Sequence, residues 1–160
     1  MDKIIRFHYT EYNSIDDLKL EDRQLLECAI NATKNAYAPY SEFKVGAAIL
    51  LANGVIVTGT NQENAAYPSG LCAERVAMFY ASSQYPNIAF KTIAVTANSD
   101  KVTIDKPLSP CGSCRQVMVE YETLSKGNIR VILAGTTGKI HIINSTKDLM
   151  PFPFVPEDLK

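Results

Sequence analysis

Three cysteines have the spacing of metal ligands. Cys111 and Cys114 are separated by two residues in LSPCGSC, and Cys72 stands in GLCAER. A Cys-x-x-Cys pair where a turn enters a helix lets two thiolates converge on one ion, although the pair alone is as compatible with redox chemistry or packing. Cys72 also lies where we expect a helix to begin, and the free backbone N–H groups there stabilise thiolates. Three such ligands leave the fourth position of a tetrahedral zinc open to water, as in catalytic zinc sites.

Glu74, two residues after Cys72, supplies the acid–base group that an open zinc site needs. From that position it can accept a proton from water at the metal and return the proton to a leaving group. Taken singly, an acidic residue in a first helical turn is more simply explained by the positive end of the helix. The neighbouring cysteines favour the catalytic interpretation. Arg75 could offset the charge of three thiolates through hydrogen bonds, or it could be a surface arginine.

The elements that must position these residues follow from the hydrophobic pattern. Leu25 and Ala29 recur at helical spacing before Pro39, and Asn53-Gly54 between two apolar runs is a strong hairpin signal. The expected order is helix, hairpin, helix, strand, helix, strand and strand, in residues 20–38, 43–63, 72–83, 91–98, 111–122, 129–135 and 139–144. Because helices separate several strands, part of the sheet must be parallel. The sequence therefore predicts an α/β fold, a three-layer α/β/α sandwich around a mixed, mainly five-stranded sheet.

The composition limits the possible partners. Sixteen Lys and Arg against 17 Asp and Glu give a net charge of −1 over 160 residues, without any block of like charge. Nucleic acid is therefore not an expected partner. The N-terminus lacks the apolar run of a signal peptide, and no stretch reaches the roughly 18 apolar residues of a membrane span, so we expect a cytoplasmic protein without membrane contact. The four cysteines should then stay reduced, which favours metal binding or catalysis over disulfides.

The order Cys-Ala-Glu and then Pro-Cys-x-x-Cys resembles the signature of the zinc-dependent nucleoside and nucleobase deaminases. With a cysteine as the first ligand, the chain is similar to the small, all-cysteine cytidine deaminases. The resemblance runs from about residue 36 to residue 159. It implies one deaminase domain over 1–160, in which residues 1–14 form an N-terminal extension. It also implies a homotetramer.

The resemblance further implies a reaction. Cys72, Cys111 and Cys114 would hold Zn²⁺, which activates a water molecule, and Glu74 would shuttle protons to the base and the departing amine. The substrates implied are cytidine and deoxycytidine, which become uridine and deoxyuridine in pyrimidine salvage. In the family pattern, the backbone at Ala73 helps to bind the base.

Two polar residues indicate how a nucleoside would be held. Asn61 and Glu63 are two positions apart in an expected extended segment, so their side chains point to the same face. An amide and a carboxylate placed in this way can share the hydroxyls of one ribose. Without the resemblance, polar residues at a strand end would be the simpler explanation. The pair matches the family's Asn-x-Glu pattern, and Phe43 matches a family aromatic that packs near the substrate.

Aromatic residues elsewhere suggest that the site is completed by another subunit. In the family, a phenylalanine near the C-terminus stacks on the base in a neighbouring subunit's active site. Phe154 in MPFPFVPEDL aligns best with that residue, with Phe152 as a close competitor. Tyr67 lies in a segment that resembles the family's subunit contact. A buried loop tyrosine explains Tyr67 equally well on chemistry alone.

Three alternatives to an ordinary nucleoside deaminase differ in what they require. A deaminase for a nucleoside-like antibiotic or a modified base would share the cysteines and Glu74, but it would not need Asn61 and Glu63. A nucleic-acid editor is disfavoured by the near-neutral charge. A non-catalytic, zinc-stabilised binding module would need the metal for folding and could dispense with Glu74.

Overall fold

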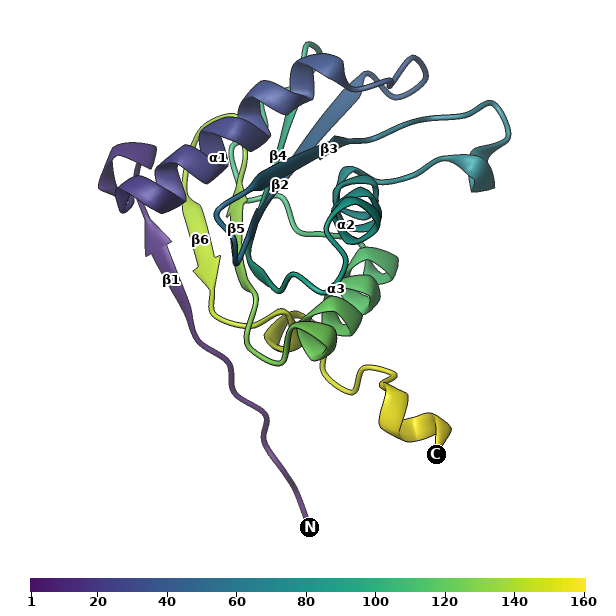
Figure 1. Ribbon diagram of the computed structural model, residues 1–160. Coiled ribbons are helices and arrows are strands. Elements are labelled where there is room, and N and C mark those ends of the chain that lie inside the picture. The colour runs from purple at the N-terminus through teal and green to yellow at the C-terminus, as the bar shows by residue number, and fades with distance from the viewer.

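The computed structural model describes all 160 residues, and a six-stranded mixed sheet is its middle layer (Figure 1). The strands are β1 (Tyr9–Tyr12), β2 (Phe43–Leu51), β3 (Ile56–Thr60), β4 (Phe90–Ser99), β5 (Arg130–Ala134) and β6 (Ile140–Ile143). The helices are α1 (Leu20–Ala32), α2 (Ala73–Gln84) and α3 (Gly112–Ser125). The spatial order is β1-β6-β5-β4-β2-β3, and β4–β5 is its one parallel pair. No helix combines the length and the apolar character needed to cross a membrane.

The helices cover both faces of the sheet, which confirms the predicted α/β class and its three layers (Figure 1). On one face, Leu25 and Leu26 of α1 belong to a buried cluster with Ile132 of β5. On the other face, Met78 of α2 and Met118 of α3 are buried in a second cluster with the sheet. Burial of apolar side chains on both faces is what holds the helices against the sheet.

Two glycines let the helices approach the sheet closely. On Gly46 in β2, an added Cβ would lie 2.1 Å from the Ala29 carbonyl oxygen of α1. On Gly59 in β3, it would lie 2.4 Å from the Ala77 nitrogen and 2.6 Å from the Ala73 carbonyl oxygen of α2. All three distances are shorter than a Cβ tolerates, so a side chain at either position would push a helix off the sheet. Gly59 therefore helps to fix where α2 begins.

The predicted hairpin is confirmed. β2 and β3 pair antiparallel from Gly46↔Thr60 to Leu50↔Ile56. In the connecting turn, Gly54 has φ 85°, a left-handed conformation that glycine adopts without steric cost. The hairpin brings the start of β2 beside the residues that follow β3.

The sheet has six strands where the sequence predicts five. The additional strand, β1, lies inside the segment assigned as an N-terminal extension and pairs antiparallel with β6, from Tyr9↔Ile143 to Tyr12↔Ile140. β1 has only four residues, and they show no alternation of buried and exposed positions. Its sequence therefore carries no period-2 signal, and its place is decided by the free edge of β6.

A buried ion pair ties α1 to β5. The Asp22 carboxylate accepts hydrogen bonds from both terminal nitrogens of Arg130, each at 2.8 Å. The Asp22 side chain is 5% exposed, whereas that of Arg130 is 34% exposed. A bidentate pair with one buried partner fixes the orientation of α1 as well as its distance from the sheet.

Candidate active site

The structure brings the three cysteines together at the starts of two helices. Cys72 is the N-cap residue of α2, Cys111 is the N-cap residue of α3, and Cys114 lies in the first turn of α3. Their three Sγ atoms lie within 4.8 Å of one another, and those of Cys72 and Cys111 are 3.9 Å apart. Zn–S bonds of about 2.3 Å place the sulfurs of a tetrahedral site roughly 3.8 Å apart. This donor set therefore fits Zn²⁺.

Two of the clustered cysteines have pKa values that are shifted in opposite directions. A hydrogen bond from Cys114, with further help from Arg75, lowers the pKa of Cys72 to about 5. The same hydrogen bond and burial raise the pKa of Cys114. Arg75 lies against the cluster, with its Nη2 3.6 Å from the Cys72 Sγ. The Arg75 Nε is buried without a hydrogen-bond partner.

Glu74 is a buried carboxyl beside the cluster. It is 4% exposed and contributes to the wall of a cavity of about 730 Å³. Burial raises the pKa of its carboxyl group, and the nearby charge of Cys72 adds to this effect. A carboxyl group whose pKa is raised toward neutrality can both accept and return a proton at physiological pH.

The same cavity contains most of the predicted substrate residues. Its lining includes Phe43, Asn61, Glu63, Tyr67, Cys72, Glu74, Arg75 and Cys111. The volume lies within the range of small-molecule sites. The cavity is therefore lined by a carboxylate, an amide and two of the three clustered cysteines.

Asn61 and Glu63 are both held by the chain around them. The Asn61 side chain accepts a hydrogen bond from the Val45 N–H and donates one to the Phe43 carbonyl oxygen, each at 2.8 Å. The Glu63 carboxylate accepts hydrogen bonds from the loop that precedes β2, including one of 2.8 Å from the Tyr40 N–H. Each side chain is thus fixed in orientation before a ligand arrives.

Three predicted residues lie outside the cavity lining: Cys114, which is fully buried in the cluster, and two substrate residues. Ala73 is fully buried in the first turn of α2, between Cys72 and Glu74. Phe154 is 58% exposed in the C-terminal segment, where Gln116 of α3 accepts a hydrogen bond from its N–H at 3.2 Å and donates one to its carbonyl oxygen at 2.6 Å. Within a single chain, its ring is not part of the site.

The sequence reasoning missed several residues of the site. Tyr40 and Ser41 line the cavity from the loop before β2, and Leu108 and Ser109 line it from the segment before Cys111. The hydroxyl groups of Tyr40 and Ser41, immediately before an apolar strand, were the one available signal. That signal does not distinguish a binding loop from an ordinary polar turn.

Comparisons with known proteins identify the class of the chain. The family model described as the cytidine and deoxycytidylate deaminase zinc-binding region matches residues 19–126. This region includes α1, α2, α3 and all three clustered cysteines. The fold and the site are therefore those of a zinc-binding deaminase.

Individual relatives define the family more closely. A cytidine deaminase of Halalkalibacterium halodurans is 42% identical over 139 residues, which cover 86% of this chain and 98% of that protein. A crystal structure of cytidine deaminase from Burkholderia pseudomallei has a TM-score of 0.71 at 40% identity and covers 86% of this chain and 100% of that one. A crystal structure of cytidine deaminase from Mycobacterium tuberculosis has a TM-score of 0.65 at 28% identity, and the match covers 86% of this chain and 99% of that one. The chain belongs to the cytidine deaminase family and is an enzyme whose cofactor is zinc.

Proposed function

We propose that this enzyme hydrolyses cytidine and deoxycytidine to uridine and deoxyuridine, with release of ammonia. The observation that carries the proposal is the position of Glu74, a buried carboxyl group in the cavity wall beside three clustered sulfurs. The names of the Halalkalibacterium and Burkholderia relatives support the choice of substrate. We further assign the reaction to pyrimidine salvage in the cytoplasm, with residues 1–160 acting as one deaminase domain.

The chemistry divides between the metal and the chain. Zn²⁺, held by Cys72, Cys111 and Cys114, supplies an activated water when it is bound. Glu74 accepts the two protons of the attacking water one after the other, and delivers the first to the ring nitrogen N3 and the second to the departing amine. Water thereby replaces the amine at C4, and one ammonia leaves for each water consumed. Arg75 offsets part of the thiolate charge through its hydrogen bond to Cys72.

The remaining wall of the cavity binds the nucleoside. Asn61 and Glu63 hold sugar hydroxyls, Phe43 packs near the base, and the backbone at Ala73 contacts the base. The presence of both Asn61 and Glu63 in the cavity favours an ordinary nucleoside over a modified base that lacks the sugar. Each polar side chain is already oriented, which reduces the entropy lost on binding.

We also propose that Phe154, not Phe152, stacks on the base in the site of a second subunit, and that the enzyme is a homotetramer. Gln116 forms hydrogen bonds with both the N–H and the carbonyl oxygen of Phe154, and this restraint on its backbone supports the choice of Phe154. Phe152 is 88% exposed, with φ 58°. Tyr67, 91% exposed at the cavity rim, is available for a contact between subunits.

Replacement of Glu74 tests the proposed reaction. In Glu74→Gln we expect kcat for cytidine to fall by about 10³-fold or more, because the variant cannot transfer the protons. Zinc content and thermal stability should match the parent protein. Uridine formation and ammonia release measure activity, with Glu120→Gln on the exposed face of α3 as the matched control. Full activity of Glu74→Gln would contradict the assigned role.

Two phenylalanine variants test the composite site. Phe154→Ala should raise KM for cytidine about tenfold, since stacking on a base contributes about 1–3 kcal/mol. Phe152→Ala should leave KM unchanged within a factor of two. Steady-state kinetics and sedimentation, measured together, separate loss of stacking from loss of assembly. The reverse ranking of the two variants would transfer the role to Phe152.

A further inference from the structure

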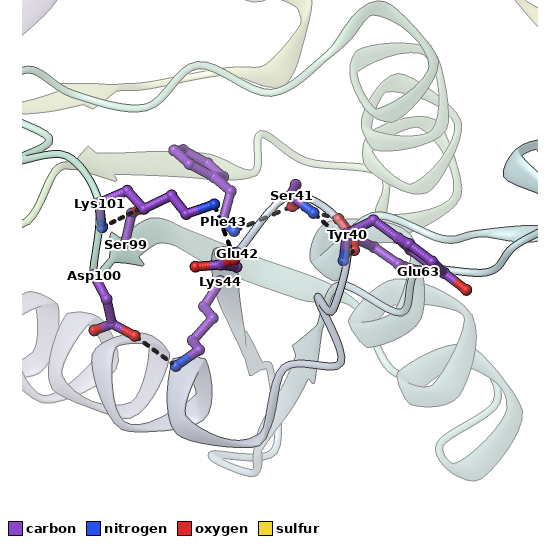
Figure 2. A network of polar contacts seen from close by, with 9 residues as sticks. All are labelled: Tyr40, Ser41, Glu42, Phe43, Lys44, Glu63, Ser99, Asp100 and Lys101. Carbon is purple, nitrogen blue, oxygen red and sulfur yellow. Dashed lines mark hydrogen bonds and ion pairs between the residues drawn. The ribbon is translucent and has the colours of Figure 1, made fainter.

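Glu63 is clamped by the loop before β2, as Figure 2 shows. One carboxylate oxygen, Oε2, accepts hydrogen bonds from the Tyr40 N–H at 2.8 Å and from the Ser41 N–H at 3.3 Å. The other, Oε1, accepts a hydrogen bond from the Ser41 hydroxyl. Three donors from two adjacent residues thus converge on one side chain of the cavity wall.

The clamp determines what Glu63 can still bind. A carboxylate offers about four acceptor positions and no donor when it is ionised. Three of those positions are occupied by the loop, which leaves about one for a ligand. The hydrogen bond from Ser41 also lowers the pKa of Glu63, so the group stays ionised near neutral pH. Glu63 is therefore presented as a single, fixed acceptor for one hydroxyl group.

Ser41 also connects Glu63 with the strand that begins next to it. Its hydroxyl oxygen accepts a hydrogen bond from the Phe43 N–H at 3.1 Å while it donates to Glu63. Phe43 begins β2, and its carbonyl oxygen accepts the hydrogen bond from Asn61. Hydrogen bonds of the Ser41 side chain thus connect the Glu63 carboxylate with β2, and the first residue of β2 also orients the Asn61 amide.

Two exposed ion pairs join the loop and the start of β2 to the residues that follow β4 (Figure 2). Lys101 contacts Glu42 at 2.9 Å, and Lys44 contacts Asp100 at 3.3 Å. Between Ser41 and Phe43, Glu42 has φ 55°, in the left-handed region that is unfavourable for a side-chain-bearing residue. The loop therefore keeps a specific bend that aims the Ser41 hydroxyl at Glu63.

We propose that Ser41 is a positioning residue for substrate specificity: it orients Glu63 so that the enzyme recognises a sugar hydroxyl of its nucleoside substrate. The inference rests on the proposed function, because Glu63 must contact the sugar. Ser41 acts through Glu63 and takes no part in the proton transfers. Its contribution is confined to substrates that offer Glu63 a hydroxyl.

The test compares two substrates in one variant. Ser41→Ala should raise KM for cytidine on the order of tenfold, as expected for loss of a hydrogen bond to a charged group, and change kcat little. 2′,3′-Dideoxycytidine lacks the hydroxyls that Glu63 would bind. On this substrate, Ser41→Ala and the parent enzyme should have the same kcat/KM. Ser41→Thr, which keeps the hydroxyl, should recover most of the loss. Adding Ser41→Ala to Glu63→Gln should cause no further loss.

Controls separate this role from a general effect on the loop. Ser99→Ala removes a serine hydroxyl from the same network, where it accepts a hydrogen bond only from the Lys101 N–H, and should behave as the parent enzyme. Equal losses with cytidine and dideoxycytidine in Ser41→Ala, or an unchanged KM for cytidine, would overturn the inference alone. Parent enzyme that is inactive on cytidine would overturn the proposed function and this inference with it.

Discussion

The two faces of the sheet are packed in the same way, but only one of them carries the candidate active site. On each face a helix rests on a strand glycine, Gly46 under α1 and Gly59 under α2. The N-cap residue of α1 is Lys19, which belongs to no cluster of metal-binding side chains. The N-cap residues of α2 and α3 are Cys72 and Cys111, which do. The packing is therefore common to both faces, and the residues at the helix starts decide which face can perform chemistry.

The buried carboxyl groups differ in what they contact. Asp22 on the α1 face is paired with Arg130. Glu122 of α3 is equally buried and accepts hydrogen bonds from the Ile129 and Thr146 N–H groups, at 2.9 and 2.8 Å. Glu74 is the buried carboxyl that lines the cavity, and burial raises its pKa. A buried carboxyl group that is fully bonded supports the fold, whereas one facing a cavity remains free to exchange a proton.

The largest expected difference between the faces comes from replacing the two glycines. Gly59→Ala should lower kcat/KM for cytidine by about 10²-fold, because displacement of α2 moves Cys72 and Glu74 together. Gly46→Ala should destabilise the protein by about 1–3 kcal/mol through overpacking, yet keep zinc and most activity when folded. Activity, zinc content and urea unfolding distinguish the two variants. If Gly46→Ala lost as much zinc as Gly59→Ala, the two faces would not differ in their effect on the metal site.

Removal of zinc should affect the faces unequally. Without the metal, the cysteine cluster no longer ties the start of α2 to the start of α3, so amide protons in the first turns of both helices should exchange faster. Amides of α1 should keep their protection. Hydrogen exchange before and after treatment with a chelator, followed by readdition of Zn²⁺, provides the measurement and its control. Uniform loss of protection would mean that the metal holds the whole fold.

The smallest expected effect on activity comes from the α1 face. Asp22→Ala should cost about 1–2 kcal/mol of unfolding free energy, because Arg130 loses a bidentate partner but is exposed enough to be hydrated, while kcat/KM for cytidine stays within a factor of two. The neighbouring Arg23→Ala removes only exposed ion pairs, to Asp16 and Glu27, and should leave stability unchanged. Urea unfolding compares the two variants. A fall in activity for Asp22→Ala at full zinc loading would show that the faces are coupled.

The sequence predicts the parts of the sulfur cluster well because helix starts are local features. Cys111 and Cys114 are found from their spacing, and Cys72 is found from its place at an expected helix start. The hairpin at Gly54 is predicted for the same reason. For the Cys111–Cys114 pair and for the hairpin, the signal lies within a few residues. Cys72 is 39 positions from Cys111, and it is the order of the two motifs, which resembles that of the deaminases, that joins Cys72 to the pair.

The loop before β2 and the strand β1 could not be predicted because contacts distant in sequence decide them. Ser41 is important through Glu63, 22 positions away, and no local pattern relates the two residues. β1 depends on β6, and the register Tyr9↔Ile143 joins the two ends of the chain. The sequence also leaves open whether Arg75 is a surface residue, and only the fold places its guanidinium beside the Cys72 sulfur.

β1 has a consequence for how the protein behaves in concentrated solution. Without it, the Ile-rich strand β6 would form the edge of the sheet, with a row of unpaired N–H and C=O groups open to another chain. Exposed apolar edges promote aggregation. β1 covers the edge with only four residues and places Glu11 opposite His141, where it also pairs with Lys139. The outermost strand is thus short and charged, which disfavours edge-to-edge association.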